Sequence, residues 1–233
     1  MSASVLWAFK QGGLLNKPQI SISDSIAIKS NLSPVLQSCN KNDLLKSWVL
    51  IIWSMNFLIG FTTFPFQNYL SSYLRTELNF RVDYTAHIWT VIGVVGMFSG
   101  LAIGWLSDKI GLRVAMLLAY ACIVFSALIF VYYPSGYWPI VAGVLFSTAF
   151  YPIFGLIPAY VSKQASSASC AVMIFGIANV MQGTGGMLGN YGFGLLASLS
   201  KTFTPIYGAI ALVSMILILL TIKLPKTSLA ITP

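Results

Sequence analysis

Charged residues are scarce in this sequence. Asp, Glu, Lys and Arg make up only 8% of its 233 residues, whereas 57% are hydrophobic. Water-soluble domains carry about 25% charged residues, so this composition excludes an ordinary soluble domain. Acidic residues are the rarest, at five against 13 Lys and Arg. A basic excess of this kind is typical of the cytoplasmic loops of a membrane protein, so it indicates no nucleic-acid partner.

Long stretches of the chain have no charge at all. No charged residue occurs from Val114 to Ser162 or from Gln164 to Ser200. A helix that crosses a bilayer needs about 20 apolar residues. The first stretch therefore has room for two spanning helices and the second for one long or tilted helix. These runs predict an all-α, polytopic protein embedded in a lipid bilayer.

Residues suited to catalysis or metal binding are few. Cys39, Cys122 and Cys170 are scattered and form no C-x-x-C pair, which predicts small apolar packing residues and neither a metal site nor a disulfide. His87 is the single histidine, and we expect it near the outer end of a helix in a structural role. The sequence predicts no cofactor.

The acidic residues are all expected in loops or tails. They are Asp24, Asp43, Glu77, Asp83 and Asp108. None is expected in the middle of the membrane, where carboxylates couple transport to protons or sodium. If the protein binds a small molecule, this absence favours a neutral one.

The chain divides into a polar segment, six apolar segments and a short tail. Residues 1–46 are rich in Ser, Asn and Lys, which predicts a flexible cytoplasmic segment, and residues 224–233 form the tail. The six predicted spans are 47–69, 84–106, 112–133, 138–161, 170–198 and 203–222, within a transmembrane domain 47–223. Six spans place both termini on one side. Most Lys and Arg lie on that side, and Arg75, Arg81 and Lys201 lie opposite, which predicts cytoplasmic termini in the plasma (inner) membrane.

The spans repeat in character. The first and fourth carry a polar or aromatic face beside a proline, the second and fifth a glycine-rich face, and the third and sixth are plain. The polar faces hold Asn56, Gly60, Thr63 and Gln67, and Ser147, Tyr151, Phe154 and Pro158; the glycine-rich faces include Gly93, Gly96, Gly100 and Gly104, and Gly176, Asn179, Gly183, Gly186 and Asn190. This order predicts a 3+3 inverted repeat.

Each kind of face suggests an environment. Polar faces with proline belong against protein or a water-filled cavity, and glycine faces allow another helix to approach closely. The candidate cavity residues are therefore Asn56, Thr63, Gln67, Ser147 and Tyr151. The candidate helix-interface residues are Gly96, Gly100, Gly183, Gly186 and Asn190. Ordinary helix packing explains any single one of these faces equally well.

A cluster of charge, GWLSDKIGLR at 104–113, stands between the second and third spans. We expect a cytoplasmic turn, with Gly111 in the tight bend and Asp108 just ahead of the third helix, where the helix dipole favours a carboxylate. Lys109 and Arg113 are expected to pair with Asp108 or with headgroups. A short loop that follows the positive-inside rule accounts for the same residues.

This stretch resembles the signature loop of the Major Facilitator Superfamily, roughly G-x-x-x-D-[RK]-x-G-x-[RK]. The matching residues are Gly104, Asp108, Lys109, Gly111 and Arg113. The resemblance covers about residues 47–223 and implies a small-molecule transporter that works by alternating access. It also implies that the first and fourth spans line a substrate cavity, that the second and fifth pack between two halves, that the third and sixth face lipid, and that the loop is a conformational switch.

Some features depart from the family pattern. Members usually have twelve spans, the basic cluster after Gly111 is reduced to Arg113, and GMLGNYG stands where antiporters have GPxxGG. The N-terminal SVLWAFK is similar to the end of a preceding span. These points favour the C-terminal half of such a transporter, as one partner of a split pair or a truncated frame. A homodimer is less favoured because the halves normally pack as unlike partners.

Other classes of function remain open. An inactive fragment or a non-transporting membrane scaffold explains the same spans. An intramembrane enzyme is disfavoured, because Ser99 lacks the GxSG spacing of a rhomboid protease and His87 lies on the same predicted helix. Substrate, direction of transport and coupling ion are not encoded in any motif of the sequence.

Overall fold

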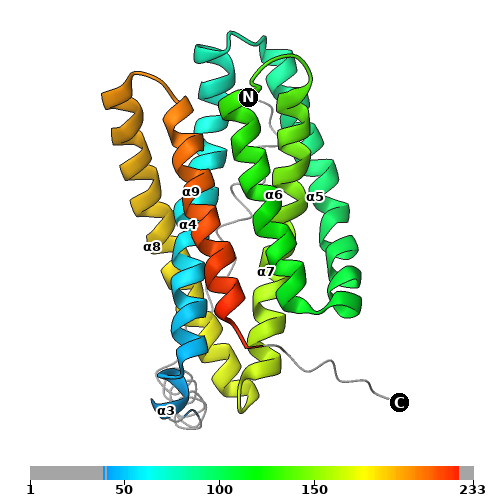
Figure 1. Cartoon of the computed structure of the whole chain (residues 1–233), viewed down its shortest axis with the longest axis vertical. Coiled ribbons are helices and arrows are strands. Elements are labelled where there is room, and N and C mark those ends of the chain that lie inside the picture. The colour runs from blue at the N-terminus through cyan, green and yellow to red at the C-terminus, as the bar shows by residue number, and fades with distance from the viewer. Residues whose placement is uncertain (1–38, 40, 226–233) are drawn as a thin grey trace, which may run out of the picture. The chain divides into compact units, whose positions relative to one another are not determined.

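A computed structural model of the chain describes residues 39 and 41–225 (Figure 1). Within those residues the protein is all-α and has no strand. The elements in chain order are α3 (Lys41–Leu44), α4 (Ser47–Ser72), the π-helix η2 (Tyr73–Glu77), α5 (Val82–Ile110), α6 (Leu112–Tyr132), α7 (Trp138–Gln164), α8 (Ala168–Ser200) and α9 (Thr204–Lys223). Residues 1–38 and 226–233, which include most of the polar segment and tail predicted above, lie outside the described residues.

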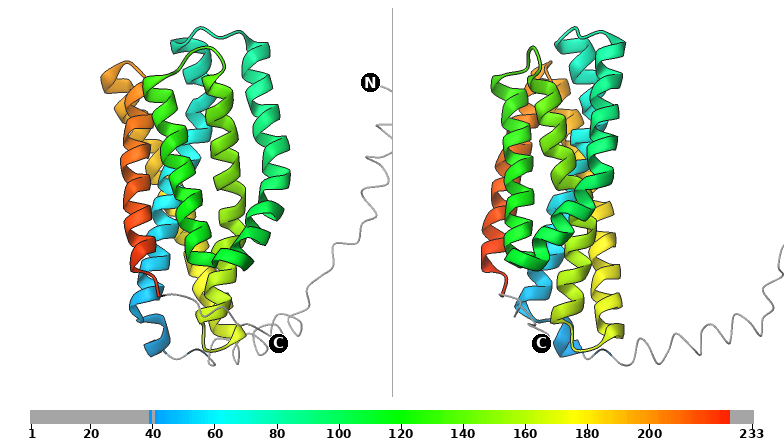
Figure 2. Two further views of the ribbon diagram at one scale, coloured as in Figure 1. Left: turned by 45° about the vertical axis from the view of Figure 1, so that its right-hand side comes forward. Right: turned by 90° about the vertical axis from the view of Figure 1, so that its right-hand side faces the viewer.

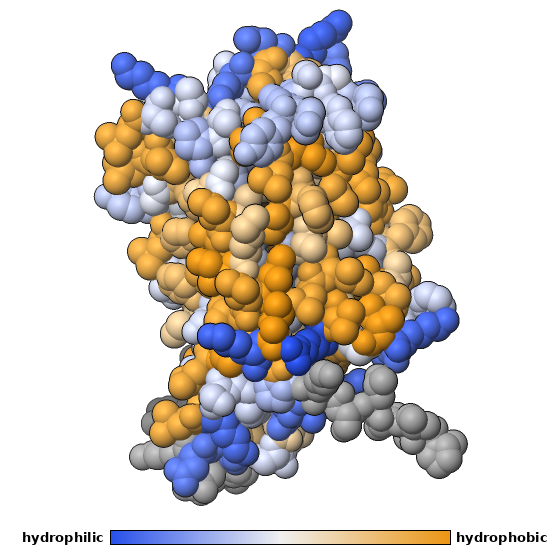
Figure 3. Space-filling view, in the orientation of Figure 1, coloured by the Kyte–Doolittle hydropathy of each residue, from blue (hydrophilic) through white to orange (hydrophobic). Residues whose placement is uncertain are grey.

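Six of these helices are long and apolar enough to cross a membrane, which confirms the six predicted spans. On the face seen in Figure 3, hydrophobic residues cover the middle and hydrophilic ones gather toward the two ends. The observed helices extend beyond several predicted spans, most clearly at both ends of α5 and α8. Residues 41–44 were expected in a flexible segment, but they form the short helix α3.

Three prolines lie inside the spanning helices without ending them, namely Pro65 in α4 and Pro152 and Pro158 in α7. Proline removes one backbone N–H and so leaves the carbonyl four residues earlier without its helical partner. In a membrane such a carbonyl is tolerated where neighbouring protein covers it. The carbonyl of Phe61, four residues before Pro65, lies against Gly189 of α8.

The helices pack in a definite pattern. α4 packs mainly on α8, α5 on α7, and α6 on both α7 and α9. Seen from the side, α6 and α9 lie along one flank and α5 and α8 along the other (Figure 2). Pairing of the first span with the fifth and of the second with the fourth is compatible with a 3+3 repeat, which stays a prediction.

Aromatic side chains fill the centre where α4, α6, α7 and α9 meet. Phe66 stacks on Phe146 with ring centroids 3.9 Å apart, and Phe130 and Tyr207 close around Phe66. The hydroxyl of Tyr73 donates to the carbonyl of Phe130 at 2.7 Å. All five rings are buried, so this cluster holds the four helices together with large apolar contacts.

The prediction that no disulfide forms is wrong. Cys39 and Cys170 are joined across 131 positions of sequence, with their Cα atoms 4.9 Å apart, and Cys122 is free. The pair was missed because folding, not sequence spacing, brings the chain before α3 against the first turn of α8. Nearby, Ser166 donates to Asp43 at 3.0 Å. Hydrogen bonds from Lys46 and Ser166 lower the pKa of Asp43.

This pairing predicts a count of free thiols. After purification without reductant, denaturation and alkylation, one cysteine per chain, Cys122, should be modified, and all three should be modified after reduction. Intact-mass spectrometry measures the number. Three modified cysteines without reduction would contradict the disulfide, whereas Cys39→Ser should free Cys170 and give two.

Candidate functional site

The loop at 104–113 is shorter than expected. α5 continues to Ile110 and α6 begins at Leu112, so Gly111 alone connects them. Gly111 has a φ of 89°, a backbone conformation that residues with a Cβ rarely adopt. Its N–H donates to the carbonyl of Ser107 at 2.9 Å. The expected role of Gly111 in the tight bend is therefore confirmed.

Asp108 is not ahead of the third helix, as the sequence predicted. It lies in the last turn of α5, exposed, and α6 has no side-chain N-cap. The turn was misplaced because α5 extends four residues beyond its predicted end at Leu106, so the chain reverses after Asp108 rather than at it. Among the described residues, Asp108 has no hydrogen bond or ion pair.

Lys109 and Arg113 each have another partner in the described structure. The ammonium of Lys109 lies 3.7 Å from the centroid of the Trp105 ring. Arg113 donates from Nε to the carbonyl of Thr221 at 3.1 Å and from Nη2 to the carbonyl of Ile222. These carbonyls belong to the last turn of α9, where backbone carbonyls have no N–H partner within the helix. Arg113 therefore caps α9, which the loop motif alone did not indicate.

Replacing Arg113 with Gln should loosen the end of α9. Hydrogen bonds that involve a charged group stabilise by about 1.5–3 kcal/mol, so we expect a loss of that size in the free energy of unfolding. Hydrogen exchange should speed up at the last turn of α9. Lys109→Gln is the matched control, with a loss below about 1 kcal/mol because an exposed cation–π contact contributes little. Equal losses would contradict the capping role.

A pocket of 330 Å³ brings the loop together with one cavity candidate. It lies between the ends of α5 and α7 and is lined by Gly100, Gly104, Ser107, Asp108, Leu112, Tyr151, Pro152, Gly155, Leu156, Ala159 and Lys163. Asp108 and Tyr151, chosen from separate sequence patterns, thus share one pocket wall. Lys163, which the sequence analysis did not single out, adds a cation to the same wall.

The other cavity candidates lie deeper in the helix bundle. Asn56, Thr63 and Ser147 are buried and donate to carbonyls of their own helices. Gln67 is half-buried, and its amide donates to the carbonyl of Thr63 at 3.4 Å. Tyr151 differs from them because 41% of it is exposed. In this structure Tyr151 has the most accessible side chain of the five.

The predicted interface glycines divide into two groups. Gly96 is covered by the Tyr151 ring and Gly186 by the Phe64 ring, whereas Gly100 and Gly183 face open space with nothing within 4 Å of an added Cβ. Asn190 accepts from the amide of Asn68 at 2.9 Å, and its carbonyl accepts from Tyr69 at 2.8 Å. Gly186 and Asn190 therefore join α4 to α8.

The glycines that lie directly against the backbone of the facing helix were not among the candidate interface residues. Gly60 lies against the backbone of Gln182 and Gly186, Gly185 against that of Phe57, and Gly189 against that of Phe61. For two of the three the sequence did give the signal, because Gly185 and Gly189 form a GxxxG step on the fifth predicted span, a spacing that allows close helix approach.

No metal site accompanies the pocket. Within residues 39 and 41–225, no three His, Cys, Asp or Glu side chains come together in a way that could hold a metal ion. In the described part of the chain, this pocket presents the polar side chains of Ser107 and Tyr151 and the charged side chains of Asp108 and Lys163 to a ligand.

Six apolar spans, a one-residue turn with exposed Asp108 and an open glycine face define a polytopic helical membrane protein. Residues 3–190 match the family model of the Major Facilitator Superfamily, and the chain belongs to this superfamily of membrane transporters. The comparison with curated proteins found no match. The match begins within the N-terminal polar segment, earlier than the region 47–223 that the sequence resemblance covered.

Proposed function

We propose that the chain is one six-helix half of a transporter that carries a small molecule by alternating access. The observation that supports it most is the presence of exposed polar groups and open glycines on α8 and α5, which lie opposite α6 and α9 in the side view of Figure 2. The outer face of α8 exposes Asn179, Gly183 and Thr184. The large exposed side chains of α6 and α9, such as Phe125 and Leu219, are apolar. α5 and α8 also expose large apolar side chains, such as Leu101 and Leu199, but polar groups and glycines lie among them.

Exposed polar groups are costly in lipid because the hydrocarbon offers no hydrogen bonds. Thr184 satisfies its hydroxyl with the carbonyl of Val180 at 2.9 Å. Asn179 has no hydrogen bond among the described residues, so its amide needs a partner outside them. The part of α8 around Asn179 therefore suits protein or water, whereas the exposed side chains of α6 and α9, such as Phe125 and Leu219, suit lipid.

Glycines without a neighbour on α5 and α8 also suit a helix–helix interface. Gly93 and Gly100 on α5 and Gly176 and Gly183 on α8 have nothing within 4 Å of an added Cβ. Such positions let a second helix approach closely. We propose that the occupant is a second, unlike six-helix half. A second copy of this chain is the alternative outcome of the tests below.

In this proposal, Asp108 and the pocket that it lines control the closing of the cytoplasmic side during alternating access. An exposed carboxylate without a partner in the described chain is free to meet a donor on the second half when the cytoplasmic side closes. The Lys and Arg distribution supports cytoplasmic termini in the plasma (inner) membrane. The Cys39–Cys170 disulfide at the same end argues against this orientation, because disulfides are rare in the reducing cytosol. Transport, rather than catalysis, is the activity we propose.

The proposed substrate cavity comprises Asn56, Thr63, Gln67, Ser147 and Tyr151. Their side chains are uncharged, which supports a neutral, hydrogen-bonding solute. Tyr151 and Gln67 would meet such a solute in the conformation described here, because they are the least buried of the five. Asn56, Thr63 and Ser147 would require α4 and α7 to shift before they became accessible.

A swelling assay with a panel of solutes tests the proposal. The chain is reconstituted in liposomes alone and together with a second half purified from the same membranes, and light scattering follows the uptake of neutral polyols, sugars and amino acids. We expect selective uptake only when both halves are present, and we expect Tyr151→Phe to reduce it. Uptake that is absent in both preparations favours a scaffold or inactive fragment. Equal uptake by the chain alone favours a homodimer.

A further inference from the structure

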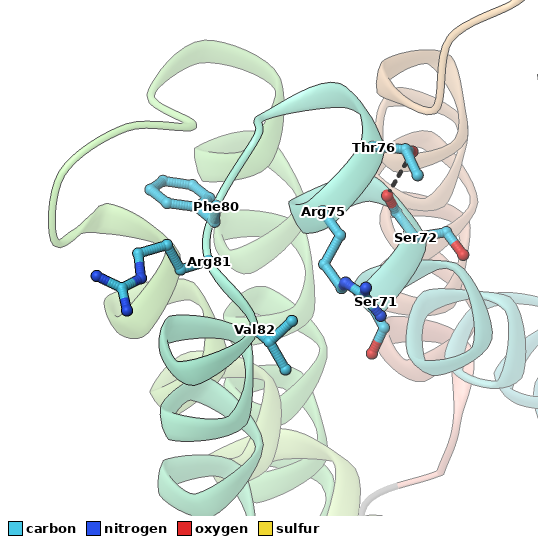
Figure 4. A pocket seen from close by; sticks show the side chains of 7 residues that line it. All are labelled: Ser71, Ser72, Arg75, Thr76, Phe80, Arg81 and Val82. Carbon is cyan, nitrogen blue, oxygen red and sulfur yellow. Dashed lines mark hydrogen bonds between the residues drawn. The ribbon is translucent and has the colours of Figure 1, made fainter.

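A second pocket lies at the end of the molecule opposite the Gly111 turn. Here α4 passes into η2, where Leu78 N–H bonds to the carbonyl of Tyr73 at 3.1 Å. π-Helical turns of this kind are rare and occur often at functional sites. The pocket has a volume of 470 Å³ and is lined by Ser71, Ser72, Arg75, Thr76, Phe80, Arg81 and Val82 (Figure 4).

Arg75 is the uncompensated charge of this pocket. The described part of the chain provides no hydrogen bond or ion pair to its guanidinium, which bends back beside Ser71 (Figure 4). Two carboxylates are near in sequence, but both are engaged elsewhere. Glu77 accepts from Phe203 N–H and from Thr204 Oγ1 at the start of α9, and Asp83 pairs with Arg81 at 3.2 Å.

The hydroxyl groups of Ser71 and Ser72 are further hydrogen-bond donors in this pocket. Ser71 Oγ accepts from Trp89 Nε1 at 2.8 Å, which orients the hydroxyl and leaves its own O–H free to donate. The hydroxyl of Ser72 has no partner among the described residues, and Phe80 and Val82 supply apolar wall. Arg81 points away from Arg75 in Figure 4. The pocket thus presents donors and no unpaired acceptor charge.

We propose that this pocket binds a phosphate group through Arg75, with Ser71 and Ser72 as further donors. Guanidinium groups match the oxygens of phosphate with paired, charge-assisted hydrogen bonds. The pocket lies at the end of two spans, the depth at which lipid headgroups carry their phosphates. The same chemistry fits free phosphate in solution, so the two sources are separated by experiment.

Two binding measurements on the purified full chain separate these sources. Equilibrium dialysis with radiolabelled inorganic phosphate, in neutral detergent and at constant ionic strength, tests the free anion. Native mass spectrometry from nanodiscs of phosphatidylcholine with a minor share of phosphatidylglycerol tests the headgroup. Arg75→Gln should weaken whichever binding occurs by about tenfold, the size expected for losing charge-assisted hydrogen bonds. Ser72→Ala should weaken it less.

Lys201→Gln is the matched control, because Lys201 is an exposed cation at the same end of the molecule and outside the pocket. Saturable phosphate binding that is lost in Arg75→Gln and kept in Lys201→Gln supports a free anion. The same pattern for phosphatidylglycerol alone supports a lipid headgroup. No binding in either arm, or equal loss in both variants, overturns the proposal. Arg75 is exposed, so Arg75→Gln should unfold at the same temperature as the parent without ligand.

Discussion

Replacing Gly60 or Gly185 with alanine is expected to disrupt the packing of α4 on α8. An added Cβ at Gly60 would overlap the backbone of Gln182, and one at Gly185 would overlap the backbone of Phe57. Backbone atoms have no rotamer to change, so the helices must separate. Overpacking of this kind costs about 1–3 kcal/mol, and each substitution should lower the stability of the full chain to unfolding in detergent by that amount.

Gly183→Ala is the control for this experiment, because Gly183 lies on the same helix and nothing lies within 4 Å of its added Cβ. Its stability should equal or slightly exceed that of the parent, since alanine favours a helix more than glycine does. A loss in Gly183→Ala equal to that in Gly185→Ala would show that glycine content, rather than the contact with α4, determines the stability. Unchanged stability in Gly60→Ala would contradict the packing.

Asp108→Asn is expected to reduce transport by about tenfold, once a transported solute has been found. The substitution keeps the shape of the side chain and removes the charge proposed to meet the second half. Removing one member of a desolvated charge pair costs at least about 2 kcal/mol, which exceeds a factor of ten. Initial uptake rates in paired-half liposomes measure the effect. Lys109→Ala should reduce them less than threefold, because its ammonium already lies over Trp105.

Asp83→Asn provides the matched control for the charge. Asp83 is exposed on the same helix as Asp108, at the other end, and pairs with the exposed Arg81. Exposed pairs contribute about 0–1 kcal/mol, so transport should be close to that of the parent. Uptake by Asp108→Asn at the parental rate would leave the positive-inside rule as the sole explanation of the charged turn. Equal losses in both variants would point to a general effect of charge.

Hydrophobic length was sufficient to predict six spans, because a bilayer imposes a similar apolar length on every crossing helix. The contacts of particular residues were harder to predict. Arg113 was expected to pair with Asp108, its near neighbour in the predicted loop, or with headgroups, yet it reaches α9 at Thr221. Sequence neighbours alone do not show that a distant helix ends beside them.

The glycine faces illustrate the same limit. Helical periodicity identified Gly183 and Gly186 as members of one face, but the structure separates them, with Gly183 open and Gly186 under Phe64. Gly185 and Gly189, on the neighbouring face, contact the α4 backbone directly. Periodicity gives the faces of a helix, and only packing shows which face meets which neighbour. The cysteine pair was missed for a related reason, since Cys39 and Cys170 meet through tertiary folding.

The most direct test of the half-transporter proposal is labelling in native membranes. Gly183→Cys on α8 and Leu219→Cys on α9 are made singly in a chain without other cysteines, and their modification rates with a lipid-soluble maleimide are compared. Both positions are exposed in the chain alone. The proposal predicts fast modification at 219 and slow modification at 183, where a second half excludes the reagent. Equal rates at the two positions would contradict it.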